Sequence, residues 1–403
     1  MKYNFNKKIN RKKTSCFKWD HRKKIFGTED ILPFNVSDMD FAIPKIVQKA
    51  LRKRLKHPVL GYTMRTDDFF KSLTSWLKKR YHWEVENDSI IPIHSIVPSI
   101  YSSIQGFTEP GDGIIVQPPV YNPFAELILS NNRKVLYNEL IANKIDHRYK
   151  IYYSIDFDDF EEKAKQAKLF LFCSPHNPVG RVWTHIELEK IGNICKKHNV
   201  KIFSDEAHSD LVFKRYKHIP FGSLKDFHDM SVTAMSPSKS FNIGGLNTSM
   251  LIIPNPEIRK QMEEMLKRIG FIGSDGAVFS NVIGLKALEI CYSKCEDWLE
   301  ALNEHLDSNR QYIHDFIENE IPQLKISDSE SLYMAWIDFS ALGLRQWELE
   351  DFMINKAKLG LVTGTKFGEN GLGFMRMNFA CSRKVLEKAM LNLKKEIDKI
   401  NRR

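Results

Sequence analysis

The chain has 403 residues, of which 42% are hydrophobic and 27% are charged, and its formal net charge at pH 7 is +10. A length of this order predicts two domains, or three at most, and the composition excludes a globally disordered chain. Apolar runs such as 250–253 are far too short to cross a bilayer, which excludes a membrane-spanning protein.

The N-terminal region is rich in basic residues, at Lys2, Lys7, Lys8, Arg11, Lys12 and Lys13. Such a patch can contact nucleic acid, but no nucleic-acid-binding motif accompanies it, and we expect a solvated, frayed terminus and no nucleic-acid partner. We see no apolar segment of a signal peptide. The six cysteines form no CxxC pair and no zinc-binding pattern with histidine, so we expect no metal and a reduced, cytoplasmic setting.

The middle of the chain alternates short apolar runs with amphipathic stretches. This pattern is typical of βαβ units around a mostly parallel, buried sheet. A helix is expected at 185–198. The runs expected to be strands are 113–116, 167–173, 200–204, 231–235 and 248–253.

From about residue 291 the chain mixes long amphipathic helices with short strands near 334–339 and 373–379, which predicts a smaller α/β domain. We therefore predict an α/β fold with two domains and an N-terminal segment that associates with the smaller one. The expected ranges are 1–50 for the N-terminal segment, 51–290 for a large domain with a mostly parallel central sheet, and 291–403 for the small domain.

Polar residues that could carry chemistry lie just after the predicted strands, where open α/β sheets bind ligands. Lys239 lies in such a place, in the sequence SPSKSFN (236–242). A lysine there can be desolvated, which lowers its pKa and frees its amine to attack a carbonyl group. The hydroxyl groups of Ser236 and Ser238 could bind a phosphate. Taken alone, a surface lysine in a serine-rich loop is the commoner interpretation.

Asp205 follows the apolar run 200–204. A carboxylate at a buried strand end is costly unless it pairs with a cation, and a protonated pyridine nitrogen is such a cation. His208 is expected one helical turn further on, where it could bind a phenolic oxygen of the same ligand. The alternatives are a helix N-cap for Asp205 and a hydrogen-bonded core histidine for His208.

Other candidate side chains have weaker signals. Asn177, in the rigid turn SPHNPVG (174–180), could donate to an anionic ring oxygen or simply form an Asn-Pro turn. Arg376 is a lone cation in an apolar strand, suited either to binding a carboxylate or to an internal ion pair. Tyr121 could stack on a flat ring or belong to the core. Tyr62 cannot be distinguished from a turn aromatic.

The order of these motifs from Tyr121 to Arg376 resembles that of the fold-type I, aspartate-aminotransferase-like enzymes, which depend on pyridoxal 5′-phosphate (PLP). Within that group the chain is similar to the cystathionine β-lyase (C–S lyase) branch of the MalY/PatB type. Aminotransferases of the aspartate type usually carry tyrosine where this chain has His208 and arginine where it has Asn247, and both differences favour the lyase branch. The segments that carry the likeness are FKWD (17–20), VSDMDF (36–41), GYT (61–63), DEAHSD (205–210) and SPSKSFNI (236–243).

The resemblance implies roles around the cofactor. Lys239 would attach PLP through its amine, and Asp205 would pair with the pyridinium nitrogen. Asn177 and His208 would contact the ring oxygen, and Tyr121 would stack on the ring. The phosphate would be held by Ser236, Ser238, the backbone near Ile96 and Val97, and Tyr62 from the second subunit of a homodimer with shared active sites.

The resemblance also implies how an amino-acid substrate is bound. Arg376 would bind its carboxylate, and the segment around Ser37 would approach it. The branch usually has Trp-Val-Ala-Asp-Met-Asp there, so Asn35 and Ser37 leave the substrate preference open. The phosphate segment SIVP (95–98) also lacks the usual glycine.

The function that these features favour is PLP-dependent β-elimination from cystathionine or another S-substituted cysteine. The products would be pyruvate, ammonia and a thiol, and Lys239 would remove the α-proton. An aminotransferase on the same scaffold is the first alternative. A regulatory protein that keeps the PLP fold and acts by partner contact is the second, and the basic N-terminus is the feature that would support it.

Overall fold

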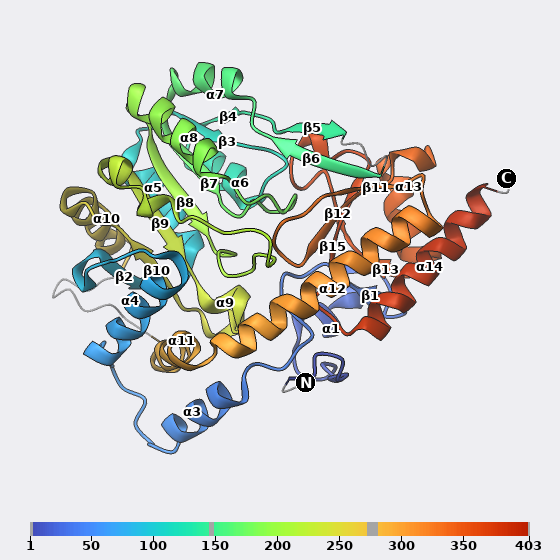
Figure 1. Cartoon of the computed structure of the whole chain (residues 1–403), viewed down its shortest axis with the longest axis horizontal. Helices are drawn as coiled ribbons and strands as arrows, with labels where there is room; N and C mark the ends of the chain where they lie inside the picture. The colour runs from blue at the N-terminus through green and yellow to red at the C-terminus, as the bar shows by residue number, and fades with distance from the viewer. Residues whose placement is uncertain (1–2, 145–148, 272–280, 402–403) are drawn as a thin grey trace.

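The computed structural model describes residues 3–144, 149–271 and 281–401 (Figure 1). Its larger sheet has seven strands. Five neighbouring strands run parallel, and β10 is antiparallel to both of its neighbours. In spatial order the strands are β2 (Ile90–Ile93), β10 (Ser249–Ile252), β9 (Ser231–Met235), β8 (Lys201–Glu206), β7 (Ala167–Cys173), β3 (Gly113–Val116) and β4 (Lys134–Tyr137).

Both faces of this sheet are buried under helices. Ile114 and Val116 of β3 pack on one side, in a cluster with α5, α6 and α10, while Ile115 packs on the other side with α7 and α8. Burial on both faces explains why the strands are continuous apolar runs rather than alternating ones. The covering helices are α5 (Ile96–Phe107), α6 (Pro123–Ser130), α10 (Pro256–Arg268), α7 (Phe157–Ala164) and α8 (His185–Lys197).

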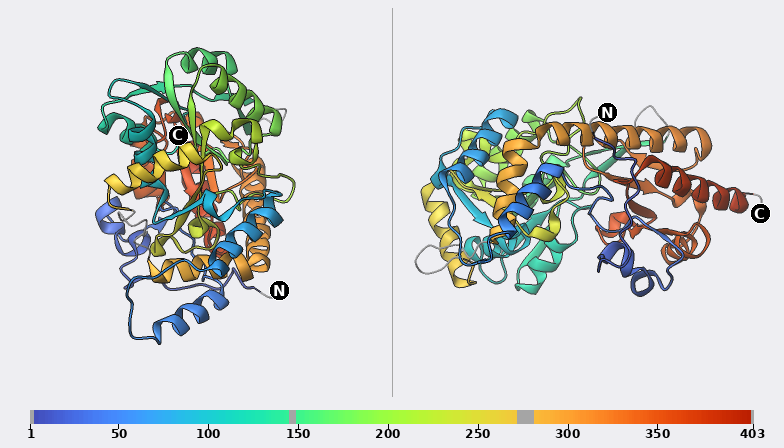
Figure 2. Two further views of the ribbon diagram at one scale, coloured as in Figure 1. Left: turned by 90° about the vertical axis from the view of Figure 1, so that its left-hand side faces the viewer. Right: turned by 90° about the horizontal axis from the view of Figure 1, so that it is seen from below.

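A second, six-stranded sheet lies beside the first. The long helix α12 (Glu296–Glu320) runs along it, with α14 (Arg383–Asn401) at its side (Figures 1 and 2). In order its strands are β14 (Val362–Thr363), β15 (Phe374–Asn378), β12 (Met334–Asp338), β11 (Lys325–Ser327), β6 (Lys150–Ser154) and β5 (Ile141–Lys144).

The remaining elements border these sheets. Helices α3 (Lys45–Leu55) and α4 (Asp67–Tyr81) both contact α11 (Val282–Lys294). Strand β1 (Leu32–Pro33) pairs in parallel with β13 (Leu359–Gly360), which ties the N-terminal segment to the C-terminal part of the chain. The short helices are α1 (Phe17–Asp20), α2 (Arg22–Phe26), α9 (Pro237–Ser240) and α13 (Gln346–Asp351).

The predicted domain ranges do not coincide with the two sheets. Strands β5 and β6 fall within 51–290, yet β6 pairs with β11 of the C-terminal part. The domain ranges remain a prediction, and we propose that strands β5 and β6 belong with the smaller unit.

The predicted α/β architecture with a mostly parallel sheet is confirmed, and so are most element positions. Three of the predicted strands, 113–116, 167–173 and 231–235, match β3, β7 and β9. The strand predicted at 200–204 runs on to Glu206, because Asp205 pairs with Cys173 on one side and Ala234 on the other. No helix in the described chain is long and apolar enough to cross a membrane.

Two local predictions were wrong. Residues 207–210 form turns rather than a helix, so His208 is placed by a tight turn after β8. From Tyr3 onward, the basic N-terminal region is not a frayed tail either. Phe5 is 8% exposed and packs edge-on against Phe41 and Trp298, because burial of an aromatic side chain is favourable and the nearby lysines keep their charges in water.

Candidate active site

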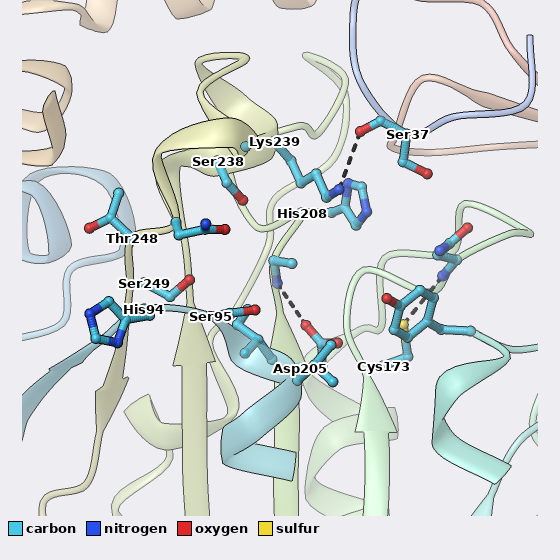
Figure 3. Close-up of a pocket in the computed structure, with 17 residues that line it drawn as sticks. Ser37, His94, Ser95, Cys173, Asp205, His208, Ser238, Lys239, Thr248 and Ser249 are labelled. Atoms are coloured by element: carbon cyan, nitrogen blue, oxygen red, sulfur yellow. Dashed lines mark hydrogen bonds between the residues drawn. The ribbon is translucent and has the colours of Figure 1, made fainter. Parts of the chain in front are cut away.

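A cavity of about 190 Å³ opens at the carboxyl ends of the parallel strands (Figure 3). Asp205 reaches it from β8 and Lys239 from α9, which follows β9. Tyr121 comes from the loop after β3 and Asn177 from the loop after β7. Parallel strands end at one edge of a sheet, so side chains far apart in sequence converge there.

The structure brings most of the predicted site residues to this cavity. Those that line it are Ser37, Ile96, Val97, Tyr121, Asn177, Asp205, His208, Ser238 and Lys239. Ser236 lies behind the wall, where its hydroxyl donates to the Thr248 carbonyl at 2.9 Å. Tyr62 is 96% exposed and does not line the cavity of its own chain.

Lys239 is held by the segment that contains Ser37. Its Nζ donates to the Ser37 carbonyl at 3.2 Å. Burial lowers the pKa of Lys239, and the nearby Arg376 lowers it further, while Asp205 and Asp38 oppose the shift. A lysine in this environment presents a larger neutral, nucleophilic fraction of its amine than a lysine in water.

Asp205 is 9% exposed, and burial raises its pKa to about 6. The amide of Ala207 donates to Asp205 Oδ1 at 3.1 Å, and this bond and Lys239 oppose the rise. His208 is also buried. Burial, with Lys239 and Arg376 adding to it, lowers its pKa to about 3, so the imidazole is neutral at physiological pH. Its Nδ1 has no hydrogen-bond partner within the described chain.

The cavity wall beside these groups is suited to an anion. Helix α5 begins there, and the side chain of its N-cap, Ser95, does not cap the first backbone N–H groups. Uncapped N–H groups and the helix dipole bind phosphates and carboxylates. Ser238 and Thr248 add hydroxyl groups to the wall, and Asn247 adds an amide.

Arg376 lies on β15, next to two of the lining residues. Nη1 donates to Asn177 Oδ1 at 3.3 Å, and Nη2 donates to the Asn35 carbonyl at 3.1 Å and to Ser37 Oγ at 3.3 Å. Burial lowers its pKa to about 10. Its Nε has no partner, and none of the described carboxylates forms an ion pair with it. The guanidinium therefore stays charged without a protein anion beside it.

Sequence reasoning missed several residues of the site, and three of them matter to the argument. Cys173, the last residue of β7, lines the cavity, and so does His94, which directly precedes the phosphate segment. Tyr333 donates to the Ser37 carbonyl at 3.1 Å. His94 and Cys173 lie next to segments that the sequence had already singled out, so counting every residue at each strand end as a candidate would have included them. Tyr333 had no local signal.

The fold and the site place the chain in a known class. The family model for aminotransferase class I and II matches residues 29–393. The chain belongs to this family. Within it, the chain is 40% identical to cystathionine beta-lyase PatB of Bacillus subtilis (strain 168), with 97% of this chain and 99% of the relative covered.

Two further comparisons point to the same branch. The chain is 32% identical to protein MalY of Escherichia coli (strain K12), covering 97% of this chain and 98% of the relative. The crystal structure of cystalysin from Treponema denticola, which contains a pyridoxal 5′-phosphate cofactor, is similar with a TM-score of 0.92 and 37% identity. The alignment covers 99% of this chain and 100% of cystalysin. The predicted MalY/PatB-type resemblance and the type I fold are thereby confirmed.

The desolvated Asp205 makes a testable contribution to stability. Its pKa is raised in the native state, so above pH 6 the ionised carboxylate destabilises the fold, and below the ordinary pKa this cost disappears. We expect Asp205→Asn to raise the free energy of unfolding of the cofactor-free protein at pH 7 by up to about 3 kcal/mol. Urea unfolding at pH 7 and pH 4 measures this, and an equal gain at both pH values would contradict the explanation.

Proposed function

We propose that this protein binds PLP and eliminates the β-substituent of cystathionine or another S-substituted cysteine, releasing a thiol and an aminoacrylate that water hydrolyses to pyruvate and ammonia. The observation that supports this most directly is that Lys239 and Asp205 are both buried and line the same cavity. The relatedness to PatB, which is named a cystathionine beta-lyase, supports the reaction class.

The residues present fit PLP. The cofactor has an aldehyde, a phosphate and a ring nitrogen that can carry a positive charge, and the cavity offers a complement to each. Lys239 would hold it through its amine. The beginning of α5 and Ser238 suit the phosphate. Asp205 is a buried carboxylate whose raised pKa indicates that it lacks sufficient positive charge nearby.

The other lining residues complete the proposed cofactor site. Tyr121 would stack on the ring, and Asn177 and His208 would contact its oxygen. Asn177 already has one contact, since its Oδ1 accepts from Arg376, and its Nδ2 donates to no group among the residues that the structure describes. His208 is neutral, so it can donate from one ring nitrogen without adding charge. Ser236 would act indirectly, by fixing the turn that carries Ser238.

The chain's own groups can then carry out proton transfer. PLP, when bound, supplies a ring that accepts the electron pair left at the substrate Cα. Asp205 would keep the ring nitrogen cationic, and Arg376 would bind the substrate carboxylate. Lys239, whose pKa is lowered by burial, takes the Cα proton. The hydrogen bonds of Ser37 to Lys239 and Arg376 keep these two groups in a fixed relation.

Substitution of Lys239 tests the proposed function. We expect Lys239→Arg to reduce pyruvate release from cystathionine by at least about 10³-fold, because a guanidinium neither attaches PLP nor accepts a proton at neutral pH. Peptide mass mapping after borohydride reduction should locate PLP on Lys239 in the wild type and nowhere in the variant. If the wild type transfers the amino group of the amino-acid substrate to a keto acid and releases no pyruvate, the aminotransferase alternative holds instead.

Substitution of Arg376 tests its proposed role in binding the substrate carboxylate. Arg376→Lys keeps the charge but loses the planar pair of N–H donors, so we expect the KM for cystathionine to rise by about 10- to 100-fold. Equilibrium titration with PLP, followed by fluorescence, should give an affinity close to that of the wild type. A variant that loses PLP and keeps its KM would place Arg376 in the cofactor site instead.

We also propose a cytoplasmic homodimer with shared active sites. The segment between α3 and α4 exposes neighbouring apolar side chains: Val59 is 61% exposed, Leu60 54% and Met64 79%. Contiguous exposed apolar surface of this kind marks a contact with another molecule. Tyr62 lies in the same segment, so a second copy packed here would receive its ring. The six free cysteines suit a reducing compartment.

Hybrid dimers test this arrangement. Co-expression of Lys239→Ala with Tyr62→Ala would give heterodimers with one doubly altered site and one intact site, provided that Tyr62 acts across the interface. Random pairing should then restore about one quarter of the wild-type activity. Lys239→Ala with Asp205→Asn is the matched control, because both residues belong to one subunit and no intact site can form. Equal activity in the two mixtures would refute the shared site.

A further inference from the structure

The wall of the cavity opposite the sheet is a segment without regular secondary structure, residues 35–41. At its centre, the Ser37 carbonyl accepts from Lys239 Nζ at 3.2 Å and from the Tyr333 hydroxyl at 3.1 Å. The Ser37 hydroxyl accepts from Arg376 Nη2 at 3.3 Å. The position of this one residue therefore affects where both the amine and the guanidinium point.

Side chains make most of the hydrogen bonds that hold this segment in place, beside one backbone bond from the Asp40 amide to the Ala380 carbonyl at 2.9 Å. On its inner side, Asn378 donates to the carbonyls of Val36 and Asp38, at 2.5 Å and 2.7 Å. Asn242 accepts from the Met39 amide at 3.0 Å and donates to the Met39 carbonyl at 3.0 Å. These bonds hold the backbone but leave the carboxylates of the segment on its outer side.

The outer side is held by Arg11, which comes from the basic N-terminal region. Its Nη1 donates to Asp38 Oδ1 at 3.0 Å, to Asp40 Oδ1 at 2.8 Å and to the Met39 carbonyl at 3.2 Å. Its Nη2 donates to the second oxygen of Asp38. The side chain of Arg11 is 20% exposed, so this two-armed contact is shielded from water and stronger than a surface ion pair.

The two carboxylates do not depend on Arg11 equally. Asp40 also accepts hydrogen bonds from two other side chains. Nζ of the buried Lys18 donates to its Oδ2 at 3.0 Å, and Nε1 of Trp19 donates to its Oδ1 at 3.0 Å. Asp38 has Lys18 only at 4.0 Å, so Arg11 is its one close cationic partner within the described chain. Loss of Arg11 would release Asp38, the residue next to Ser37, while Asp40 would stay bound.

We propose that Arg11 is a positioning residue of the active site: it fixes Asp38 and thereby the Ser37 contacts to Lys239 and Arg376. This inference rests on the proposed function for its kinetic consequence, but its structural part does not. It also gives part of the basic N-terminal region a role within the active site, rather than in contact with a partner. Removal of residues 1–13 would alter turnover even where the region has no partner.

Arg11→Met and Asp38→Asn, alone and combined, test the proposal on the PLP-loaded enzyme. We expect each single variant to raise the KM for cystathionine about tenfold with kcat changed less than about threefold, because the substrate-facing groups lose their fixed geometry. The double variant should be no worse than the worse single variant, since the two residues act as a unit. Arg11→Lys should recover part of the loss.

Lys12→Met is the matched control, since Lys12 is exposed and forms no ion pair within the described chain. It should behave like the wild type. Independent effects of Arg11→Met and Asp38→Asn that simply multiply in the double variant would overturn the proposal, as would an unchanged KM in Arg11→Met.

Hydrogen exchange provides a readout that does not depend on turnover. We expect faster amide exchange in residues 35–41 of Arg11→Met, whereas Lys12→Met should match the wild type. Should the wild type lack lyase activity while this difference persists, the proposed function fails and the positioning role stands. Unchanged exchange in residues 35–41 would overturn the positioning role. If Arg11→Met does not fold, Arg11→Lys and Asp38→Asn carry the same comparison.

Discussion

The site depends on two buried ionisable side chains, the acid Asp205 and the base Lys239, which line the same cavity. Water would stabilise the charged form of each, and the protein withholds it, so the pKa of Asp205 rises and that of Lys239 falls. Neither group is neutralised by a close ion pair with the other. The protein therefore keeps a carboxylate that favours a cationic partner and an amine that is available as a nucleophile and base, the two properties that PLP chemistry requires.

The large sheet supplies the rigidity that this arrangement needs. Asp205 lies within β8, with strands on both sides, so the backbone under the carboxylate cannot move to let water in. Lys239 is carried by α9, whose first turn is fixed by the Ser236 hydroxyl. The opposite wall has no such ladder, and the contacts of Ser37 with Lys239, Tyr333 and Arg376 couple it to the sheet side. Side chains carried by regular elements thus face a segment that is held mainly by side-chain hydrogen bonds.

Family membership and geometry contribute different parts of the functional argument. The relationship to PatB and MalY covers nearly the whole chain, so it bears on the reaction class as well as the fold. The geometry bears on this chain's own departures. Ser37 is a hydrogen-bond partner of Arg376, and Asn35 contributes its carbonyl to the same guanidinium. The serine at position 37 therefore adds a hydroxyl that the usual alanine lacks, beside the group proposed to bind the substrate carboxylate, where it can change substrate preference. The contact of Asn35 uses a backbone carbonyl, which does not depend on the side chain at that position.

The sequence by itself determined the strands, the order of the motifs and the residues at strand ends, because apolar periodicity and turn residues are local signals. It could not place Tyr333 against Ser37, assign β5 and β6 to the second sheet, or show that Arg11 contacts Asp38. Each of these is a contact between segments far apart in the chain, which depends on how the elements pack and leaves no periodic trace. The tertiary structure alone decided that a basic N-terminal region, ordinary in composition, lies against the wall of the active site.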